Sequence, residues 1–540
     1  MKKKLFLFLL YVLLILFSLT AEFETESNQS SPHFSVSHYD IQVEIFPSQK
    51  SLSAEAVLKA QTPIMDAGTI RIYLHDEFTI HNVSAEGNNL NFIIPEEVKK
   101  KPMYSPSAKP IEIDLPQADN TNGFQEIKIV YSGPISRTIN RVNLISEPLT
   151  ELALYCSWYP LLDDKQTFTY SLEVTLPEDQ KTVSDGVLCG ETKESGKITR
   201  IYERRSPGGD IPLIASNNIK VKVRESAAIK AEIYYREIDD QEVDSALGQA
   251  IRAASILTEM LGDPVNKGRL TVVYSPRGGW GYSRIPLILG SEKTYKTRLQ
   301  NRDGIVDNFH GLAHEIGHFW WSIADSSSSQ DWINEGLAEW SSLYVLEQVF
   351  GREEVNKILN NYRTEILGLN SAKPLLQTKR DDFRIAYILF YEKGAYIFEM
   401  LRTKLGDDRL FSVLKKFYQK NCGRRGAVTS DLVSDIVDEG GEEIRPFLNE
   451  LLNTNNLPRI YLEWNYQNGQ VQGKVVIKDS ALVNFPLEIL FSSEDASQEE
   501  IKTIPVSTGD NPFLFPLSFF PSQVTIDPNN RLLWIDSDLL

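Results

Sequence analysis

The hydrophobic repeat of this 540-residue chain changes its period twice, and this change limits the possible folds more than any other feature. Up to about residue 225 apolar and polar residues alternate, as in Tyr39, Ile41 and Val43, which is typical of half-buried strands. The spacing then becomes helical, and alternation returns from Leu457. We therefore predict a multidomain α+β protein. Its predicted parts are an N-terminal all-β domain (residues 30–238), a mostly helical domain (239–456) and a small C-terminal β-sandwich (457–540).

The first residues have the layout of a secretory signal. Three lysines precede an apolar run that extends from Leu5 to about Ala21. We predict that residues 1–21 are a signal peptide. Alternatively, because the run is just long enough to span a bilayer, residues 5–21 are an uncleaved membrane tether. Either reading predicts an exported protein with a periplasmic, cell-surface or secreted location.

Charge and cysteine content narrow the expected partners. The net charge of -17 disfavours nucleic acid and anionic membrane surfaces. The three cysteines, Cys156, Cys189 and Cys422, are too few for a disulfide framework. A bridge between Cys156 and Cys189 is compatible with export, although we favour inert buried thiols.

Two histidines one helical turn apart predict a metal site. A helix is predicted over residues 305–324, and residues 314–318 within it read HEIGH. His314 and His318 stand at i and i+4, so both imidazoles can bind one ion from the same helix face. Zinc in such a site lowers the pKa of a bound water toward about 7, and Glu315 lies beside it to accept the proton.

The third ligand is expected on the next helix. This helix is predicted over residues 332–350 and carries Glu335 in its first turn. The serine-rich loop before it is short enough to pack the two helices antiparallel, so Glu335 can face the two histidines. Gly317 costs a helix interior about 1 kcal/mol relative to alanine, which suggests a close contact at that point.

Neighbouring polar residues are assigned to supporting positions. His310 is two turns from His318, too far to share its ion, and is expected to be a satisfied core residue or to support a ligand. Glu339 is expected to lie beside the ligands or to face solvent. A purely structural zinc is disfavoured because such sites usually have four protein ligands rich in cysteine, and none is near.

The sequence HEIGH followed by WINEGLAEW resembles the zinc motif of the gluzincin family of aminopeptidase N and leukotriene hydrolase. In that family the glutamate ligand follows HExxH after eighteen residues, whereas here the spacer Phe319–Asn334 has sixteen. We place the shortening in the serine loop. Residues 390–401, FYEKGAYIFEML, resemble the family's YEKG segment, whose tyrosine stabilises the tetrahedral intermediate; this implies a catalytic role for Tyr391. The resemblance also implies a thermolysin-like catalytic domain with one zinc ion.

One segment departs from the family pattern. The exopeptidase members carry GxMEN, whose glutamate holds the free amine of the substrate. Residues 277–289 here read RGGWGYSRIPLIL, with Tyr282 or Ser283 at the position of that carboxylate. We expect Arg284 to repel an α-ammonium group and to favour acidic ligands. The backbone of this strand can still pair with a peptide. The predicted substrate-binding residues are Gly279, Gly281, Tyr282 and Arg284.

The sequence therefore predicts a zinc-dependent metallopeptidase acting on peptide substrates. The resemblance implies an aminopeptidase-like enzyme with altered recognition of the substrate's amino terminus. One alternative is an endopeptidase of the same fold. Another is a catalytically inactive exported homologue that binds peptides or proteins.

Overall fold

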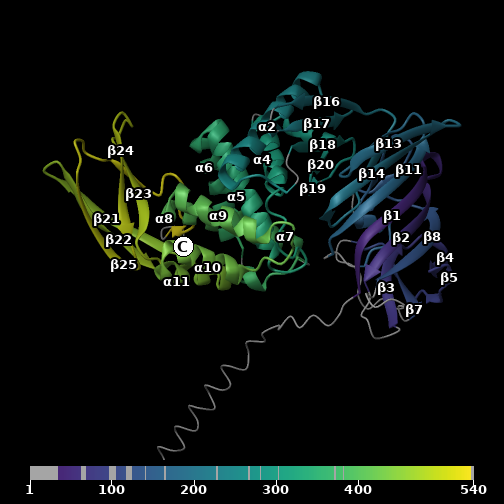
Figure 1. Cartoon of the computed structure of the whole chain (residues 1–540). Helices are drawn as coiled ribbons and strands as arrows, with labels where there is room; N and C mark the ends of the chain where they lie inside the picture. The colour runs from purple at the N-terminus through teal and green to yellow at the C-terminus, as the bar shows by residue number, and fades with distance from the viewer. Residues whose placement is uncertain are drawn as a thin grey trace, which may run out of the picture.

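In the computed structural model of the chain, the predicted units follow one another in space as they do in sequence (Figure 1). The N-terminal β domain lies at one end, the helices in the middle and the C-terminal β-sandwich at the other end. The predicted signal segment, residues 1–21, lies outside the described residues. Within them, no helix is both long and apolar enough to cross a membrane. The structure describes residues 34–61, 68–95, 105–116, 124–139, 142–162, 166–226, 229–265, 268–279, 281–301, 303–369, 373–380 and 382–536.

The alternating residues of the N-terminal domain form an eight-stranded sheet, in the order β13-β14-β11-β1-β2-β8-β4-β5. Buried side chains of its two adjacent strands β1 and β2 face one core, with Tyr39 opposite Leu58 and Ile41 opposite Ala56. The strands are β1 (Ser35–Phe46), β2 (Ser51–Gln61), β4 (Thr79–Ala85), β5 (Asn88–Asn89), β8 (Phe124–Pro134), β11 (Phe168–Pro177), β13 (Val187–Glu194) and β14 (Lys197–Gly208).

Two smaller sheets complete this domain, in the orders β12-β15-β10-β9 and β3-β7-β6. The strand β10 is used below because it reaches the wall of the candidate site. The strands are β3 (Gly68–His75), β6 (Phe92–Ile93), β7 (Ala108–Leu115), β9 (Leu144–Ile145), β10 (Thr150–Leu152), β12 (Lys181–Ser184) and β15 (Leu213–Ser216).

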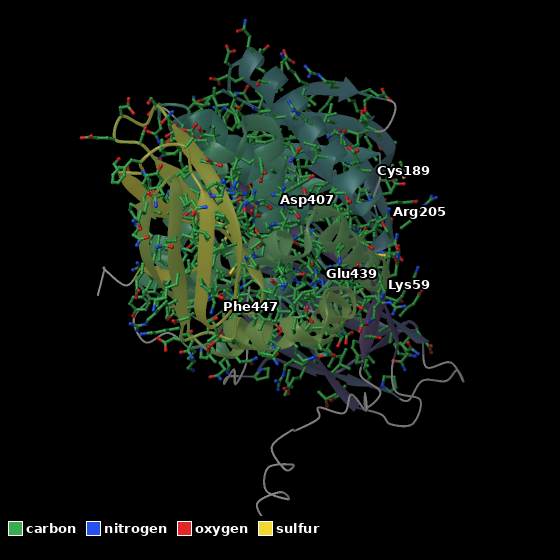
Figure 2. The ribbon with its side chains drawn as sticks, turned by 90° about the vertical axis from the view of Figure 1, so that its left-hand side faces the viewer. Lys59, Cys189, Arg205, Asp407, Glu439 and Phe447 are labelled. Atoms are coloured by element: carbon green, nitrogen blue, oxygen red, sulfur yellow. The ribbon has the colours of Figure 1, made fainter. Side chains whose placement is uncertain are left out.

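The three cysteines are free thiols. Cys156 is buried, and its burial raises the pKa of the thiol to about 12. Cys189 is exposed on β13 (Figure 2), and Cys422 is half-buried. The structure therefore has no Cys156–Cys189 bridge, and the expectation of inert buried thiols holds for Cys156 alone.

The middle unit begins with a five-stranded sheet, in the order β16-β17-β18-β20-β19. The strand β18 is parallel to β17 and β20, and β19 runs antiparallel to β20 at the edge. The domain boundary predicted at residues 238/239 assigns β16 and β17 to the N-terminal domain. In the structure both strands belong to this sheet, where Ala231 of β17 pairs with Leu270 of β18. The alternation of one strand does not reveal which sheet it joins, because pairing is non-local. The strands are β16 (Lys220–Glu225), β17 (Lys230–Tyr235), β18 (Arg269–Ser275), β19 (Tyr282–Arg284) and β20 (Leu287–Ser291).

Helices form the rest of the middle unit, as predicted. The helix predicted over 305–324 is shorter, because α4 ends at Gly317 and the chain then tightens into a turn in which the Trp320 N–H donates to the carbonyl of Gly317. Trp320 remains buried although it lies outside the helix. The helices are α2 (Asp240–Leu261), α3 (Glu292–Arg298), α4 (Gly304–Gly317), α5 (Asp331–Phe350), α6 (Arg352–Leu367), α7 (Phe383–Tyr387), a π-helix η4 (Ile388–Lys393), α8 (Gly394–Leu405), α9 (Asp407–Asn421), α10 (Thr429–Gly440) and α11 (Arg445–Asn453).

The C-terminal unit is the predicted β-sandwich, with sheets ordered β25-β22-β21-β27 and β24-β23-β26. Asn468 and Gly469, both with positive φ, form the expected hairpin turn between β21 and β22. The strands are β21 (Arg459–Gln467), β22 (Gln470–Lys478), β23 (Phe485–Ser492), β24 (Glu499–Val506), β25 (Gly509–Pro516), β26 (Gln523–Ile526) and β27 (Ile535–Asp536).

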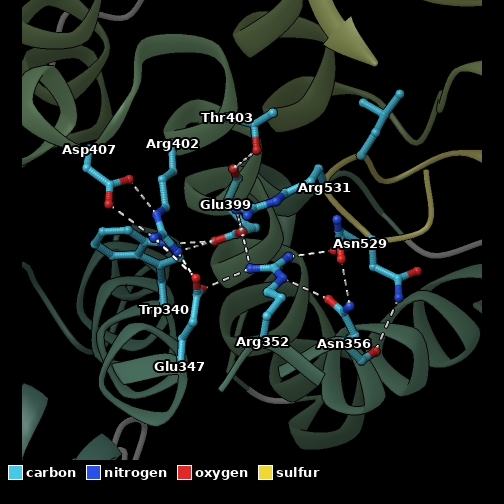
Figure 3. A network of polar contacts seen from close by, with 12 residues as sticks. Trp340, Glu347, Arg352, Asn356, Glu399, Arg402, Thr403, Asp407, Asn529 and Arg531 are labelled. Atoms are coloured by element: carbon cyan, nitrogen blue, oxygen red, sulfur yellow. Dashed lines mark hydrogen bonds and ion pairs between the residues drawn. The ribbon is translucent and has the colours of Figure 1, made fainter. Parts of the chain in front are cut away.

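A buried polar network joins the sandwich to the helices (Figure 3). Glu399 of α8 is buried and accepts hydrogen bonds from Arg352 of α6 at 2.6 Å and from Arg531 of the C-terminal unit at 2.7 Å. Burial disfavours its ionisation, but the surrounding guanidinium groups outweigh this effect and hold the pKa of Glu399 below its usual value. The two units therefore share an ionic contact as well as one continuous apolar core.

Candidate active site

The HEIGH histidines and Glu335 meet where the end of α4 packs against the start of α5. Oε2 of Glu335 lies 3.6 Å from Nε2 of His314 and 3.3 Å from Nε2 of His318. The close approach of the helices depends on Gly317, since a Cβ there would lie 3.1 Å from both Cα and O of Ala338. The close contact expected at Gly317 is present.

The three side chains fit a divalent metal ion such as zinc. Nδ1 of His314 is 2.6 Å from Oε2 of Glu339, and Nδ1 of His318 is 3.1 Å from the carbonyl oxygen of Trp321. With both Nδ1 atoms acting as donors, both Nε2 atoms keep a lone pair for a metal. The buried Oε2 of Glu335 has no hydrogen-bond partner among the residues that the structure describes. These ligand atoms all lie within 4.8 Å of one another.

Glu339 is a buried partner of His314 and does not face solvent. Its carboxylate also accepts a hydrogen bond from the hydroxyl of Tyr362, and Nε2 of His310 lies 2.8 Å from Oε1. Burial opposes its ionisation, but His310 and His314 outweigh burial and hold the pKa of Glu339 well below its usual range. Glu339 therefore orients His314, and His310 supports Glu339 and lies outside the cluster of His314, His318 and Glu335.

Glu315 lies close to the segment predicted to bind substrate. A Cβ at Gly281 would lie 3.3 Å from Oε1 of Glu315, so the carboxylate faces the backbone before β19. Burial raises the pKa of Glu315 above its usual value, although His314 and His318 oppose the rise. A carboxylate placed and shifted in this way suits proton transfer.

Tyr391 lies on the π-helix η4, with its ring stacked on that of His314 at a centroid distance of 5.5 Å. Burial raises the pKa of Tyr391 well above its usual value, so the hydroxyl remains a hydrogen-bond donor. Gly336 and Gly394 bring this segment close to α5, because a Cβ at Gly336 would lie 3.0 Å from Cα of Gly394. The glycine of the YEKG segment thus helps to position its tyrosine.

Arg380 is a site residue that the sequence analysis missed. Its guanidinium forms ion pairs with Asp331 and Glu335, and Nη1 lies 3.4 Å from the hydroxyl of Tyr391. Burial disfavours ionisation of Glu335, but Arg380 and the histidines outweigh burial and hold the pKa of Glu335 well below its usual range. No local motif marks Arg380, since its role depends on a loop that folds back over α5.

A cavity of about 930 Å³ opens beside these residues. Glu315 and Tyr391 line this cavity. So do all four predicted substrate-binding residues, which are Gly279, Gly281, Tyr282 and Arg284. The expectation for Arg284 needs correction. Its Nε is 2.6 Å from Oδ2 of the buried Asp210, so its charge is balanced and does not act on a ligand as an isolated cation.

A carboxylate from the N-terminal domain also lies behind the β19 edge. Glu151 of β10 is buried and accepts hydrogen bonds at 3.0 Å from Nε of Arg277 and at 3.1 Å from the hydroxyl of Tyr282. Its charge is therefore balanced within the protein. Glu151 is a second residue that the sequence analysis missed, because β10 is short and distant along the chain.

Comparison with known proteins agrees with this architecture. Residues 293–451 match the model of the Peptidase family M1 domain. The chain is 23% identical over 362 residues to Aminopeptidase M1-B of Oryza sativa subsp. japonica, covering 64% of this chain and 40% of that one. The chain thus spans less than half the length of this relative.

Solved structures show the same fold. The structure of Legionella pneumophila aminopeptidase A in complex with aspartic acid has a TM-score of 0.73 at 17% identity, over 95% of this chain and 60% of that one. An M1 zinc metallopeptidase from Deinococcus radiodurans has a TM-score of 0.63 at 17% identity, over 79% of this chain and 95% of that one. At this identity, the two likenesses show the fold alone. Over residues 293–451, the chain is similar to the Peptidase family M1 domain.

Proposed function

We propose that this protein is a zinc-dependent metallopeptidase that hydrolyses peptide bonds, and that it is aminopeptidase-like with altered recognition of the substrate's amino terminus. The observation that carries the proposal is the buried Oε2 of Glu335, which has no hydrogen-bond partner among the described residues and faces two imidazole nitrogens. The family match and the aminopeptidase relatives support it.

The residues around the cavity divide the chemistry between them. His314, His318 and Glu335 would hold one zinc ion, which supplies Lewis acidity toward the peptide carbonyl and acidifies a water molecule. Glu315 accepts the proton of the attacking water and passes it to the leaving amine. The hydroxyl of Tyr391 donates a hydrogen bond to the developing oxyanion, a contact worth about 3 to 4 kcal/mol in comparable sites.

Recognition of the substrate's amino terminus is the altered part of this proposal. Ser283 and Tyr282 offer no carboxylate at β19, and the nearby Glu151 is engaged by Arg277. The same observation favours, as a second candidate, an endopeptidase that pairs the backbone of β19 with an extended peptide.

Location belongs to the same proposal. The lysine-led apolar run of residues 1–21 supports export, with residues 5–21 either removed or retained as a membrane tether. A size comparison of the mature chain with the full-length sequence by intact-mass spectrometry distinguishes removal from retention.

A peptide-library digest tests the activity. Purified protein is incubated with free and amino-blocked peptides, with zinc or with a chelator, and the cut positions are read by mass spectrometry. We expect cuts that disappear with chelator and in Glu315→Gln. Cuts after the first residue of free peptides alone support an aminopeptidase, and internal cuts in blocked peptides support the endopeptidase. Zinc-loaded protein that cuts nothing, or Glu315→Gln with full activity, would contradict the proposal.

A further inference from the structure

Arg298, the last residue of α3, lines the same cavity. Its Nη1 donates to the carbonyl oxygen of Asp307 at 3.2 Å and lies against α4, where a Cβ at Gly311 would be only 2.9 Å from it. Gly311 precedes His314 by three residues, so the guanidinium lies about one helical turn, roughly 5 Å along the axis, from a proposed zinc ligand. The absence of a side chain at Gly311 makes room for this position.

Arg298 differs from the other cavity arginines described above in having no ion-pair partner among the described residues. Arg284 is paired with Asp210, and Arg380 with Asp331 and Glu335. Arg298 makes its hydrogen bond to a backbone carbonyl and, within the described ranges, has no carboxylate at ion-pair distance. The exposed side chain of Asp307 also lines the cavity but forms no such pair.

Apart from the exposed Asp307, the side chains near Arg298 are aromatic and neutral. Tyr274 and Tyr295 pack together at a ring-centroid distance of 4.8 Å, and Tyr387 lines the cavity nearby. Burial raises the pKa of all three phenols, so none of them supplies a negative charge to the guanidinium at neutral pH. A half-buried guanidinium that has no ion-pair partner and lies beside neutral aromatic side chains is suited to bind a planar carboxylate through two N–H donors.

We propose that Arg298 binds a carboxylate of the peptide next to the bond that is cut, so that this cavity selects acidic or carboxyl-terminal residues. That the bound peptide is cleaved rests on the proposed function. The carboxylate site itself rests only on Arg298, Gly311 and the cavity. Two sources supply the same chemistry: the side chain of an aspartate or glutamate, and the carboxyl terminus of a short peptide.

Matched peptides distinguish these sources. One set carries glutamate or glutamine at each position around the cleavage point, with an amidated end. A second set carries glutamine and ends one residue beyond the cut, as the free acid or the amide. For zinc-loaded protein, we expect the acidic peptide of one of the two sets to be cleaved roughly 10- to 100-fold faster than its neutral match. A ratio of this size corresponds to the free energy that a hydrogen bond to a charged group contributes. The set that shows the ratio identifies the source.

Three variants test the residue. Arg298→Gln removes the charge, and Gly311→Ala keeps the charge but displaces the guanidinium; both are expected to bring the ratio close to one. Lys296→Gln removes an exposed charge from the same helix, outside the cavity, and should preserve the ratio. Circular dichroism checks that each variant is folded.

Binding of the same peptides to Glu315→Gln, measured by fluorescence polarisation, separates this inference from the proposed activity. If no peptide is cut by zinc-loaded wild-type protein but the acidic peptide binds more tightly than its neutral match, and Arg298→Gln abolishes the difference, the activity fails and the carboxylate site stands. Equal binding and equal cleavage of acid and neutral peptides by wild-type protein would overturn the carboxylate site. A ratio that Arg298→Gln leaves unchanged would overturn it as well.

Discussion

At the residue scale, the candidate site depends on how each polar atom is satisfied. Nδ1 of His314 and Nδ1 of His318 have acceptors within the protein, which leaves the Nε2 atoms and Oε2 of Glu335 directed at one point. Buried polar atoms are rarely left without partners. Their convergence on one point is therefore the best physical argument for a bound cation.

Glu339 should strengthen metal binding through His314. We expect Glu339→Gln to weaken zinc affinity by about 10- to 100-fold, since partners of metal-bound histidines usually contribute that much. A competition titration with a chromophoric zinc chelator measures the change. Glu353→Gln, on the exposed face of α6, serves as the control. Equal affinities for wild type and Glu339→Gln would show that the contact does not orient the ligand.

Arg380 should matter most when no metal is bound. In Arg380→Gln the buried Asp331 and Glu335 lose their shared cation, a change expected to cost about 3 to 5 kcal/mol. Bound zinc replaces part of that charge, so the loss of thermal stability should be larger in chelator than in zinc. Arg384→Gln, an exposed neighbour, should change neither value. A loss of the same size under both conditions speaks against this account.

At the element scale, the packing of α4 against α5 depends on Gly317. We expect Gly317→Ala to destabilise the protein by about 1 to 3 kcal/mol, because the new Cβ meets the backbone of Ala338 at 3.1 Å. Zinc affinity should fall as well, since the helices that carry the ligands move apart. Gly426→Ala is the matched control, with nothing within 4 Å of its added Cβ. Urea unfolding measures stability, and unchanged midpoints would refute the close contact.

At this scale, the sequence predicted the features that depend on residues close together along the chain. The i and i+4 spacing of His314 and His318 and the short loop to Glu335 needed only helix geometry, and the period of the hydrophobic repeat was enough for the three units. The end of α4 at Gly317 and the pairing of β17 with β18 were missed, because a turn and a distant strand decide them. Arg380 and Glu151 were missed for the same reason: each reaches the site from a segment that carries no motif.

At the scale of the whole molecule, the three units are joined by buried charge as well as by apolar packing. Asp210 and Glu151 of the N-terminal domain balance Arg284 and Arg277 beside the cavity. At the other end, Glu399 joins α8 to the sandwich through Arg531 (Figure 3). The cavity wall is therefore built from two units, and the third unit is fixed to the helices behind it.

Glu399 should hold the sandwich in place. Glu399→Gln leaves Arg531 without a carboxylate and leaves Arg352 paired with Glu347 alone, and breaking a buried pair in this way costs about 3 to 5 kcal/mol. We expect faster limited proteolysis between α11 and β21, followed by gel electrophoresis. Glu463→Gln, which removes an exposed ion pair within the sandwich, should leave the digestion rate unchanged. Equal rates for the Glu399 variant and wild type would show that apolar packing alone fixes the unit.

The most direct test of the account is the zinc content of the purified chain. After loading and dialysis, elemental analysis should find about one zinc ion per chain in wild-type protein, as expected for a site with two imidazole ligands and one carboxylate ligand. The His314→Ala, His318→Ala double variant should retain almost none. Wild-type protein that retains no zinc, or a double variant that retains as much as wild type, would contradict the metal site.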